Sequence, residues 1–519
     1  MSPTPLFSNH SFMFPFRWDY VSSKADKEIF AFSSRTNLAD FDRVFTSCNT
    51  LKRTPFHIGK NNSKYNEYTY FHDFARKAIY FTGRENEDMS DHDMIYYELD
   101  GGKDDYFEII TLVDGNFKLK IENVCIHAYS TGVGVLTYNL SNYEYQNPSE
   151  ILKINEFGRR IYPQFITDNS LEKVKKSMLA QNIQGQLGKI KFNENFEQYL
   201  SNIDTGSSFL PPDHIKKIFG YLGQEHESSE RSFVFRREHE RKGNIRISKI
   251  TDDRMFFVCW YGNDTQSRIL AKNYEKSDWW YAYIFGDKAW KNIANTKMQN
   301  KSIEASTYQR WSNYGTLFGM TRDSFVAVTS SRENLIKNNV PDISIHMQTM
   351  YYQMAVISLA QRASVLRFSY EVNLITNALE KGENPSKKIQ DLYKNYIQFI
   401  NKLNFREITS QLQGIEMYEQ FHKVMNLDAE IKALDEEISE LHSYVSMVES
   451  SSLSKIALWF LPLGAIAGLL GTNLLDTENF DFPKMNEINI KGLSWLFGII
   501  IFSFGTSWFL SKRLNKKIK

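Results

Sequence analysis

The chain has 519 residues, a formal net charge of +1 and an aromatic content of 14%. This length exceeds one ordinary hydrophobic core, so we expect one to three compact units. The near-neutral charge argues against a general nucleic-acid-binding role, which requires a basic surface. The mean hydropathy of −0.44 reflects the polar majority of the chain, although the C-terminal end is apolar.

The N-terminal stretch and the cysteines both indicate a cytosolic compartment. Residues 1–20 lack the basic region and apolar core of a secretory signal. Cys48, Cys125 and Cys259 are odd in number, far apart and in no metal-ligand spacing, which favours reduced thiols.

Alternating β-branched and aromatic residues predict strands in the first part of the chain. The predicted strands are 107–113, 117–121, 124–140, 254–261 and 324–328, with turns at Asp114-Gly115 and Glu122-Asn123. Residues 149–161 and 168–181 are predicted to be helices. We therefore expect residues 1–344 to form a cytosolic α/β head with a mixed or antiparallel sheet.

Arginines beside aromatic residues form candidate ligand-binding groups in this head. They are Arg17 with Trp18, Arg159 with Arg160, and the group of Arg310, Trp311, Tyr314 and Arg322. Arginine and aromatic planes suit a nucleotide, whose base stacks while its phosphate is paired. Taken singly, each group is better explained by core aromatics with surface arginines. Gly132-Val133-Gly134 is not a phosphate loop and is better explained by a bend in a strand.

The sequence contains no pattern that predicts catalysis. There is no nucleophile–base arrangement, no zinc-ligand spacing and no P-loop, so we expect the protein not to be an enzyme. The acidic stretch 85–105, which includes His92, is better explained by a solvated loop than by a metal sensor.

A helical region follows the head. Residues 345–404 are expected to form a helical hairpin, with helices over 343–379 and 386–403 separated by stop signals at 381–385. Residues 405–452 are predicted to form one unbroken stalk helix, because no Pro or Gly occurs between 416 and 461. Apolar residues alternate along it at spacings of three and four, which indicates a coiled-coil seam. They are Val424, Leu427, Ile431, Leu434, Ile438, Leu441, Val445 and Val448.

Two apolar segments close the chain. Residues 453–475 carry Lys455 as their only charge, and residues 492–511 carry none. At about 1.5 Å per residue, each is close to the roughly 30 Å needed to cross a bilayer core. The intervening loop 476–491 is acidic, whereas the tail 512–519 is rich in lysine, which places both termini in the cytoplasm. We therefore expect a multi-pass protein of the bacterial inner membrane, although a simple hairpin anchor fits the hydropathy equally well.

The first apolar segment ends in the sequence PLGAIAGLLGTN, from Pro462 to Asn473. This stretch, with the preceding helix and the lysine-rich tail, resembles the CorA-type divalent cation channels over residues 415–519. The resemblance implies the following fold class: an α/β cytosolic head, a long helical stalk and two C-terminal transmembrane helices in a CorA-like homopentamer.

The resemblance also implies roles for individual residues. Gly471, Thr472 and Asn473 take the positions of the selectivity signature, where Asn473 would hold hydrated Mg²⁺ through its water shell. Helical spacing from Asn473 then predicts the pore-lining residues Leu453, Ala457, Leu461, Gly464 and Gly468. Thr472 replaces the usual methionine, and Gly464 stands where the family often has a hydroxyl group. Both departures affect the expected ion selectivity.

The enlarged head makes the chain similar to the CorA-like effectors of type III CRISPR defence. That similarity implies a channel opened by a nucleotide second messenger, S-adenosylmethionine joined to AMP (SAM-AMP). Two alternatives stay open: a housekeeping transporter of Mg²⁺ or another divalent cation, and a membrane-tethered binding protein that does not conduct. Direct binding to nucleic acid is not expected.

Overall fold

The computed structural model describes residues 5–21, 36–48, 51–84, 87–162, 179–196, 211–220, 232–235, 244–250, 253–288, 293–331, 335–336, 340–383, 385–447 and 450. They belong to two compact units, Met1–Glu436 and Glu437–Lys519. In the second unit, residues 437–447 are helical. All elements named below belong to the first unit.

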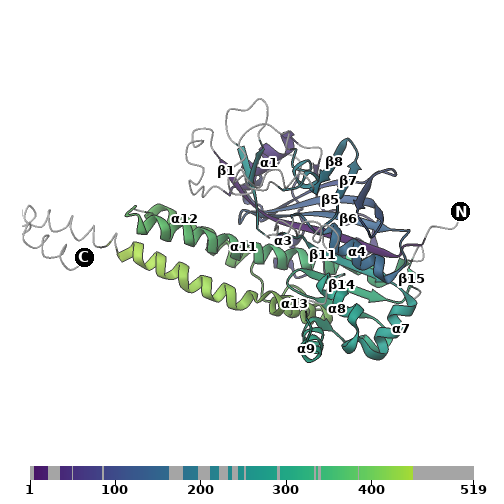
Figure 1. The fold of residues 1–519 in the computed structure, drawn as a ribbon. Coiled ribbons are helices and arrows are strands. Elements are labelled where there is room, and N and C mark those ends of the chain that lie inside the picture. The colour runs from purple at the N-terminus through teal and green to yellow at the C-terminus, as the bar shows by residue number, and fades with distance from the viewer. Residues whose placement is uncertain are drawn as a thin grey trace, which may run out of the picture. The chain divides into compact units, whose positions relative to one another are not determined.

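The described part of the first unit is built on one 14-stranded mixed sheet (Figure 1). Its main path runs β12-β13-β14-β11-β1-β6-β5-β4-β7-β8, and β2, β3, β9 and β10 pair beside this path. β11 and β14 are parallel, whereas the neighbours of β1 are antiparallel to it. The strands are β1 (Ser8–Val21), β2 (Lys52–Arg53), β3 (Met94–Asp100), β4 (Tyr106–Ile110), β5 (Asn116–Tyr129), β6 (Val133–Asn142), β7 (Asn182–Leu187), β8 (Ile190–Asn195), β9 (Ser232–Phe235), β10 (Asn244–Lys249), β11 (Phe256–Gly262), β12 (Thr307–Tyr308), β13 (Leu317–Met320) and β14 (Ser324–Thr329), with β15 (Leu335–Ile336) and β16 (Val340–Pro341) forming a separate pair.

β1 is the central strand and changes its partner halfway along. Along one edge it pairs with β11 over Ser8–Met13 and with β10 over Phe16–Val21, while β6 covers the other edge over Ser8–Arg17. Pro15 lies at the change of partner, where its missing N–H costs no hydrogen bond to β11 or β10. The sequence analysis did not predict this strand.

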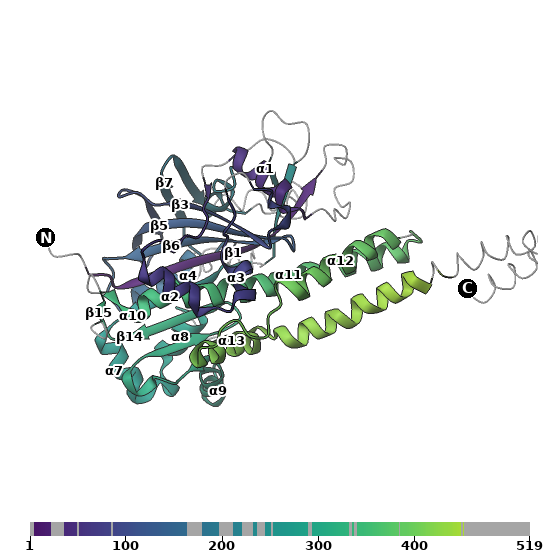
Figure 2. The ribbon, with the colours of Figure 1, turned by 180° about the vertical axis from the view of Figure 1, so that it is seen from behind.

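Helices cover both faces of the sheet. Their bounds are α1 (Leu38–Cys48), α2 (Asn62–Tyr70), α3 (Asp73–Ile79), η1 (Met89–Asp91), α4 (Pro148–Gly158), α6 (Asp213–Lys216), α7 (Asp264–Asn273), η3 (Tyr274–Lys276), α8 (Asp278–Phe285), α9 (Thr296–Ser306), η4 (Ser312–Tyr314), α10 (Asp342–Gln348), α11 (Met350–Glu380), α12 (Ser386–Lys402) and α13 (Leu412–Met425). α11 packs on β1 and β6, with α3 beside it, whereas α4 packs on β1, β4 and β11 (Figure 2).

The side chains of β1 show which helix lies on which face. Successive side chains of a strand point to opposite faces. Asn9 donates to Ser344 of α10 at 2.9 Å, whereas His10 contacts Asn155 of α4 at 2.7 Å. Odd-numbered residues of β1 therefore face α10 and α11, and even-numbered ones such as Phe12 face the side of α4.

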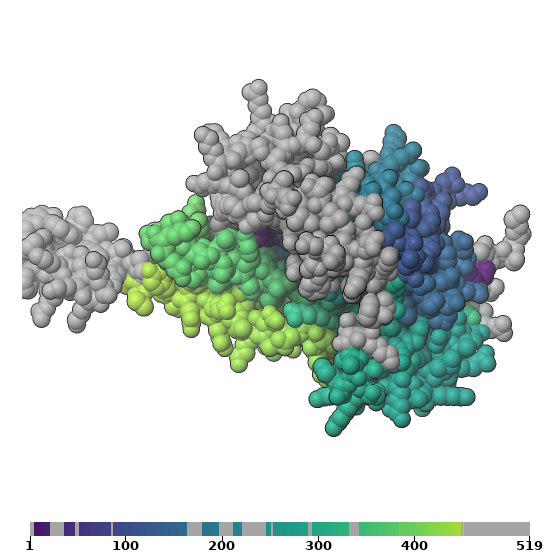
Figure 3. All heavy atoms as spheres, in the orientation of Figure 1, coloured from purple at the N-terminus to yellow at the C-terminus, as the bar shows by residue number. Residues whose placement is uncertain are grey.

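The predicted helices 343–379 and 386–403 coincide with α10–α11 and α12. Gly382, with φ at +78°, ends the first of them in the predicted stop segment. Residues 427–436 are helical again and lie beside α12, as the green and yellow-green atoms in Figure 3 show. Burial and the nearby carboxylate of Asp435 raise the pKa of the Tyr396 hydroxyl on α12.

The prediction of one unbroken stalk helix over 405–452 is wrong in two places. Residues 405–411 are not helical, and α13 ends at Asn426, whose φ of +56° and ψ of +34° are left-handed. Asparagine adopts this conformation more readily than most residues. The absence of Gly and Pro was therefore not enough to predict a continuous helix.

Among the predicted strands, one turn is misplaced. The Asp114-Gly115 turn is present, with Gly115 at a φ of +89°. At Glu122-Asn123, however, β5 continues through an irregularity between Ile121 and Asn123. β5 instead ends at Tyr129, and the chain turns at Gly132 with a φ of +76°.

The expected fold class must be corrected. The described residues form an α/β protein with a large mixed sheet, and none of their helices is long and apolar enough to cross a membrane. The longest, α11, has 31 residues but carries Arg362, Arg367 and Glu371. The expected CorA-like fold with two C-terminal transmembrane helices is therefore not the fold found here. The ranges 453–475, 476–491, 492–511 and 512–519, to which that expectation assigned spans, loop and tail, lie outside the described residues.

Candidate functional site

Arg367 ties the long helix α11 to the middle of the sheet. Its Nε donates to Glu371 Oε1 at 2.8 Å, and its Nη2 donates to Asp19 Oδ1 at 3.0 Å. Its Nη1 donates to the carbonyl oxygens of Trp18, at 2.9 Å, and Gly132, at 2.5 Å. The side chain is 1% exposed. One guanidinium thus holds together β1, the β5–β6 turn and α11.

The charges in this group support one another in a buried place. Burial lowers the pKa of Arg367, but the carboxylates of Glu371 and Asp19 outweigh it and raise the pKa overall. Burial raises the pKa of Glu371, and Arg367 opposes that shift. Arg17 joins the group, with its Nε 3.4 Å from Asp19 Oδ2 and its guanidinium 4.4 Å from the centre of the Tyr370 ring. We call Arg17, Asp19, Gly132, Arg367 and Glu371 the Arg367 network.

The predicted pair Arg17 and Trp18 is split by the sheet. Arg17 faces α11, whereas the Trp18 ring is fully buried on the other face, 5.0 Å from the ring of Phe41. Its Nε1 donates to the carbonyl of Val133 at 3.2 Å. Since neighbouring side chains of a strand point to opposite faces, these two residues do not form one ligand site.

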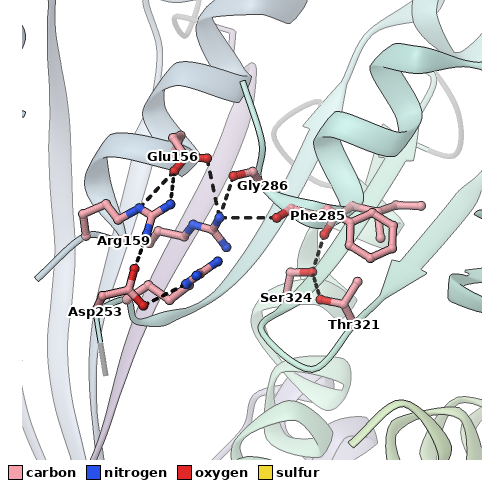
Figure 4. Close-up of polar contacts among 10 residues, drawn as sticks. Glu156, Arg159, Asp253, Phe285, Gly286, Thr321 and Ser324 are labelled. Carbon is pink, nitrogen blue, oxygen red and sulfur yellow. Dashed lines mark hydrogen bonds and ion pairs between the residues drawn. The ribbon is translucent and has the colours of Figure 1, made fainter. Parts of the chain in front are cut away.

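The second predicted pair, Arg159 and Arg160, follows the end of α4 (Figure 4). A capping box of Asn147 and Glu150 begins this helix. Gly158 ends it in close contact with the aromatic ring of Phe12 on β1. The sequence thereby brings both arginines to the start of β11, where the N–H of Met255 donates to the Arg159 carbonyl at 2.7 Å.

The two arginines share Glu156, whose Oε2 lies 3.5 Å from Arg159 Nη2, but their other partners differ. Arg160 donates from Nε to Glu156 Oε1 at 2.9 Å and from Nη1 to Asp253 Oδ2. Arg159 donates from Nη2 to the carbonyls of Phe285, at 3.3 Å, and Gly286, at 2.6 Å, at the end of α8. The Nε and Nη1 atoms of Arg159 have no hydrogen-bond partner in the described part of the chain.

The electrostatics of the pair follow from these partners. Burial lowers the pKa of Arg159 to about 10, with the charge of Glu156 opposing. Burial also lowers the pKa of Arg160, but the charges of Glu156 and Asp253 outweigh it and raise the pKa. Arg160 is thus saturated by carboxylates, while Arg159 is a buried cation that keeps unused donors.

The third predicted group divides between two places. Arg310 Nε donates to Glu416 Oε2 of α13 at 2.9 Å, and its Nη2 donates to the other carboxylate oxygen. Trp311 Nε1 donates to Gln413 Oε1 at 3.1 Å. The Tyr314 ring is 70% exposed and lies 6.3 Å from that of Trp311. Arg310 and Trp311 therefore hold α13 against the loop before β13.

Arg322 lies elsewhere, just before β14. Its Nη2 is 3.8 Å from Glu430 Oε1, and its carbonyl accepts from Nη1 of Arg362 on α11 at 2.5 Å. Arg362 also approaches Asp323 Oδ1, at 3.5 Å. The eight arginine and aromatic candidates thus do not form a single site. Arg159 and Arg322 lie near the starts of the neighbouring strands β11 and β14, whereas the other candidates contact different elements.

Two buried histidines and two buried thiols of the described core are held in neutral forms. Burial lowers the pKa values of His127 and His214 to about 3, and it raises those of the Cys125 and Cys259 thiols to about 12. None of these side chains is therefore suited to proton transfer or nucleophilic attack near neutral pH. In the portion of the chain that is described, no group of three His, Cys, Asp or Glu side chains is placed to hold a metal ion.

The remaining predicted residues are outside the described ranges. They are the selectivity signature Gly471, Thr472 and Asn473 and the pore-lining Leu453, Ala457, Leu461, Gly464 and Gly468. Their roles and the expected Mg²⁺ stay predictions.

Comparison with known proteins does not decide among these functions. No family model, curated protein or solved structure matches this chain. The resemblance to the CorA-type channels therefore depends on the sequence motif that ends at Asn473 and on its setting.

Sequence reasoning missed the partners that give these arginines their roles. Asp19, Arg367 and Glu371 connect β1 to α11. Arg254 lies near Arg159, and Arg362 donates to the carbonyl of Arg322. One local signal was present: Arg367 and Glu371 are an opposite-charge pair four residues apart in an otherwise apolar helical stretch. The contacts with β1 and the β5–β6 turn join segments too far apart in the sequence to be found by pattern.

Proposed function

We propose that this protein is a cation channel of bacterial antiviral defence, in which the α/β unit senses a nucleotide second messenger and controls ion flow through the C-terminal residues. The proposal places the chain in the bacterial inner membrane as a homopentamer that conducts Mg²⁺ or another cation, with SAM-AMP as the ligand. The Arg367 network is the structural observation that supports a sensing role.

A buried charged network is suited to transmitting a change between a sheet and a helix. Removing one partner from a buried ion pair leaves an uncompensated charge, which typically costs about 3–5 kcal/mol. Any shift of α11 against β1 must therefore move Asp19, Gly132 and Arg367 together or break their contacts. Such an element has discrete arrangements, as a switch requires.

The helices extend this coupling toward the C-terminal side of the unit. After the turn at Gly382, α11 is followed by α12. Tyr396 of α12 lies near the carboxylate of Asp435 in the helical stretch 427–436. α13 packs on α11 and is also held by Arg310 through Glu416. A displacement of α11 would therefore move both α13 and the helical stretch 427–436, which precedes the C-terminal residues.

Ion flux through liposomes containing the purified full chain tests the proposal. We expect Mg²⁺ or another cation to pass only after SAM-AMP is added. Flux driven by a Mg²⁺ gradient alone would instead favour the housekeeping transporter. No flux under either condition, with protein incorporation verified, would favour the non-conducting tether.

An Asp19→Asn variant tests the coupling in the same assay. It removes the charge facing Arg367 Nη2, so we expect the nucleotide-dependent change in flux to fall about fivefold or more. Asp40→Asn, which alters an exposed pair with Arg43 on α1, is the matched control and should behave as the unmodified chain. Equal responses from both variants would contradict the assigned role of the network.

A further inference from the structure

Four arginines meet where the parallel strands β11 and β14 begin. Phe257 of β11 lies opposite Ser324 of β14, and its N–H donates to the Asp323 carbonyl at 3.2 Å. Arg254 and Arg322, each just before its strand, therefore start from the same edge of the sheet. Arg159 reaches this edge from α4 and Arg362 from α11. We call Arg159, Arg254, Arg322 and Arg362 the arginine edge.

The carboxylates nearby do not satisfy this edge. Glu156 and Asp253 are engaged by Arg160. Glu156 Oε2 also lies 3.5 Å from Arg159 Nη2, and Asp253 accepts from Arg254 Nε at 3.2 Å. Asp323 approaches Arg362 at 3.5 Å, and Glu430 approaches Arg322 at 3.8 Å, both longer than a strong charged hydrogen bond. When Arg160 is counted, five arginines share four carboxylates here, so the positive charge is only partly compensated.

Several donors of the arginine edge lack a hydrogen-bond partner. The Nε and Nη1 atoms of Arg159 and the Nε atom of Arg362 are buried without one among the residues described. The Arg159 side chain is only 2% exposed. A buried charged donor without a partner is costly, and such groups in native proteins call for a functional explanation, such as an absent ion or ligand.

The edge is also open to solvent on one side. The side chains of Arg254 and Arg322 are 30% and 49% exposed. Guanidinium groups bind phosphate oxygens in bidentate geometry, and they do so more strongly where other positive charge is buried behind them.

We propose that the arginine edge binds a phosphate-bearing ligand, with Arg254 and Arg322 contacting the phosphate and the buried Arg159 supplying charge behind them. This inference rests on the proposed function, for which it locates the ligand and names its anionic class. Binding would draw Arg322 from Glu430, which follows the break at Asn426, and would alter the contact of Arg362 on α11. The bound ligand would thereby act on α11 and on the helical stretch 427–436 from the arginine edge.

Calorimetry on the full chain in detergent tests the site, with inorganic phosphate, pyrophosphate and AMP as probes at constant ionic strength. We expect saturable binding of pyrophosphate or AMP. Arg254→Gln and Arg322→Gln should each weaken it about tenfold, the loss of one charged phosphate contact. Arg406→Gln, at an exposed arginine between α12 and α13, is the control and should leave binding unchanged.

Unchanged affinity in both Arg254→Gln and Arg322→Gln, or no saturable binding of any probe, would overturn the site. Circular dichroism verifies that each variant is folded, and the other single variant carries the test if one of them is not. The flux assay separates the two proposals. Saturable binding without nucleotide-dependent flux contradicts the proposed function alone, whereas nucleotide-dependent flux unaffected by both substitutions contradicts the arginine edge alone.

Discussion

At the scale of single residues, Gly132 matters because it has no side chain. Its φ is +76°, and a Cβ added there would lie 1.7 Å from Nη1 of Arg367. The backbone turn and the buried guanidinium therefore occupy the space that a side chain needs. Within Gly132-Val133-Gly134, interpreted from the sequence as relief of a bend, Gly132 also accepts a hydrogen bond from Arg367 and leaves space for its guanidinium.

Gly132→Ala should destabilise the chain much more than a glycine replacement in open space. Gly382 is the matched control, because its φ is +78° and a Cβ there meets nothing within 4 Å. We expect Gly382→Ala to cost about 1–2 kcal/mol for the left-handed backbone. Gly132→Ala should cost about 2 kcal/mol more, because it disturbs a buried ion pair. Denaturant unfolding measures both, and equal losses would contradict the clash with Arg367.

Glu67, on α2, gives stability a pH dependence of definite sign. Burial raises its pKa to about 7, with the Tyr80 hydroxyl, 3.3 Å from Oε1, opposing the shift. Unfolding returns the pKa to about 4.3. Between pH of about 4.3 and 7, the folded state therefore keeps a proton on Glu67 that the unfolded state has lost. The stability that the protonated Glu67 contributes is lost as pH rises through 7.

Glu67→Gln should remove that dependence. At pH 8 we expect the variant to be about 1–3 kcal/mol more stable than the unmodified chain, with little difference at pH 4. Glu383→Gln, at an exposed position after α11, should leave the pH profile unchanged. Thermal unfolding across this pH range is the measurement, and a Glu67→Gln variant that is less stable at pH 8 would refute the argument.

At the scale of elements, the break between α13 and the stretch 427–436 depends on one asparagine. The Asn426 N–H donates back to the Lys423 carbonyl at 3.2 Å, and its own carbonyl accepts from the Glu430 N–H at 3.1 Å. His422 Nδ1 and Asp428 Oδ1, 3.0 Å apart, bridge the break. The two helices are thus separate elements with a defined joint, although their sequence permits one helix.

Substitutions at Asn426 should act in opposite directions. Glycine adopts the left-handed conformation without the steric cost of a Cβ, so Asn426→Gly should keep or slightly raise stability. Asn426→Ala favours a continuous helix and should lose about 1 kcal/mol in unfolding experiments. It should also weaken the nucleotide dependence of flux in liposomes. Identical stability of the two variants would show that the joint is not under local backbone control.

The elements also show what sequence patterns can predict. The helical hairpin and the strands near 107–140 were located because local periodicity and turn residues determine them. β1 was missed although Phe12, Phe14 and Phe16 alternate along it, since its partners lie in distant strands. Arg17 and Trp18 were grouped by proximity in the sequence, whereas the pleat of β1 directs them to opposite faces.

At the scale of the whole molecule, the candidate site was predictable in its residue types but not in its assembly. Arginine and aromatic residues were selected from the sequence as candidates, and in the structure their partners are carboxylates and carbonyls from other elements. Arg310 contacts Glu416, more than a hundred residues later in the chain. No local rule specifies such a pairing. Only the folded sheet brings Arg159, Arg254 and Arg322 to one edge.

The central position of β1 also bears on how the chain is made. Its pairing with β11 requires Phe256–Gly262, so the ribosome must synthesise the chain as far as β11 before β1 can find that neighbour. Until then the backbone N–H and C=O groups of Ser8–Met13 on this edge have no strand partner. Such long-range pairing slows folding and leaves nascent chains exposed to aggregation, which makes this protein a natural client for chaperones during translation.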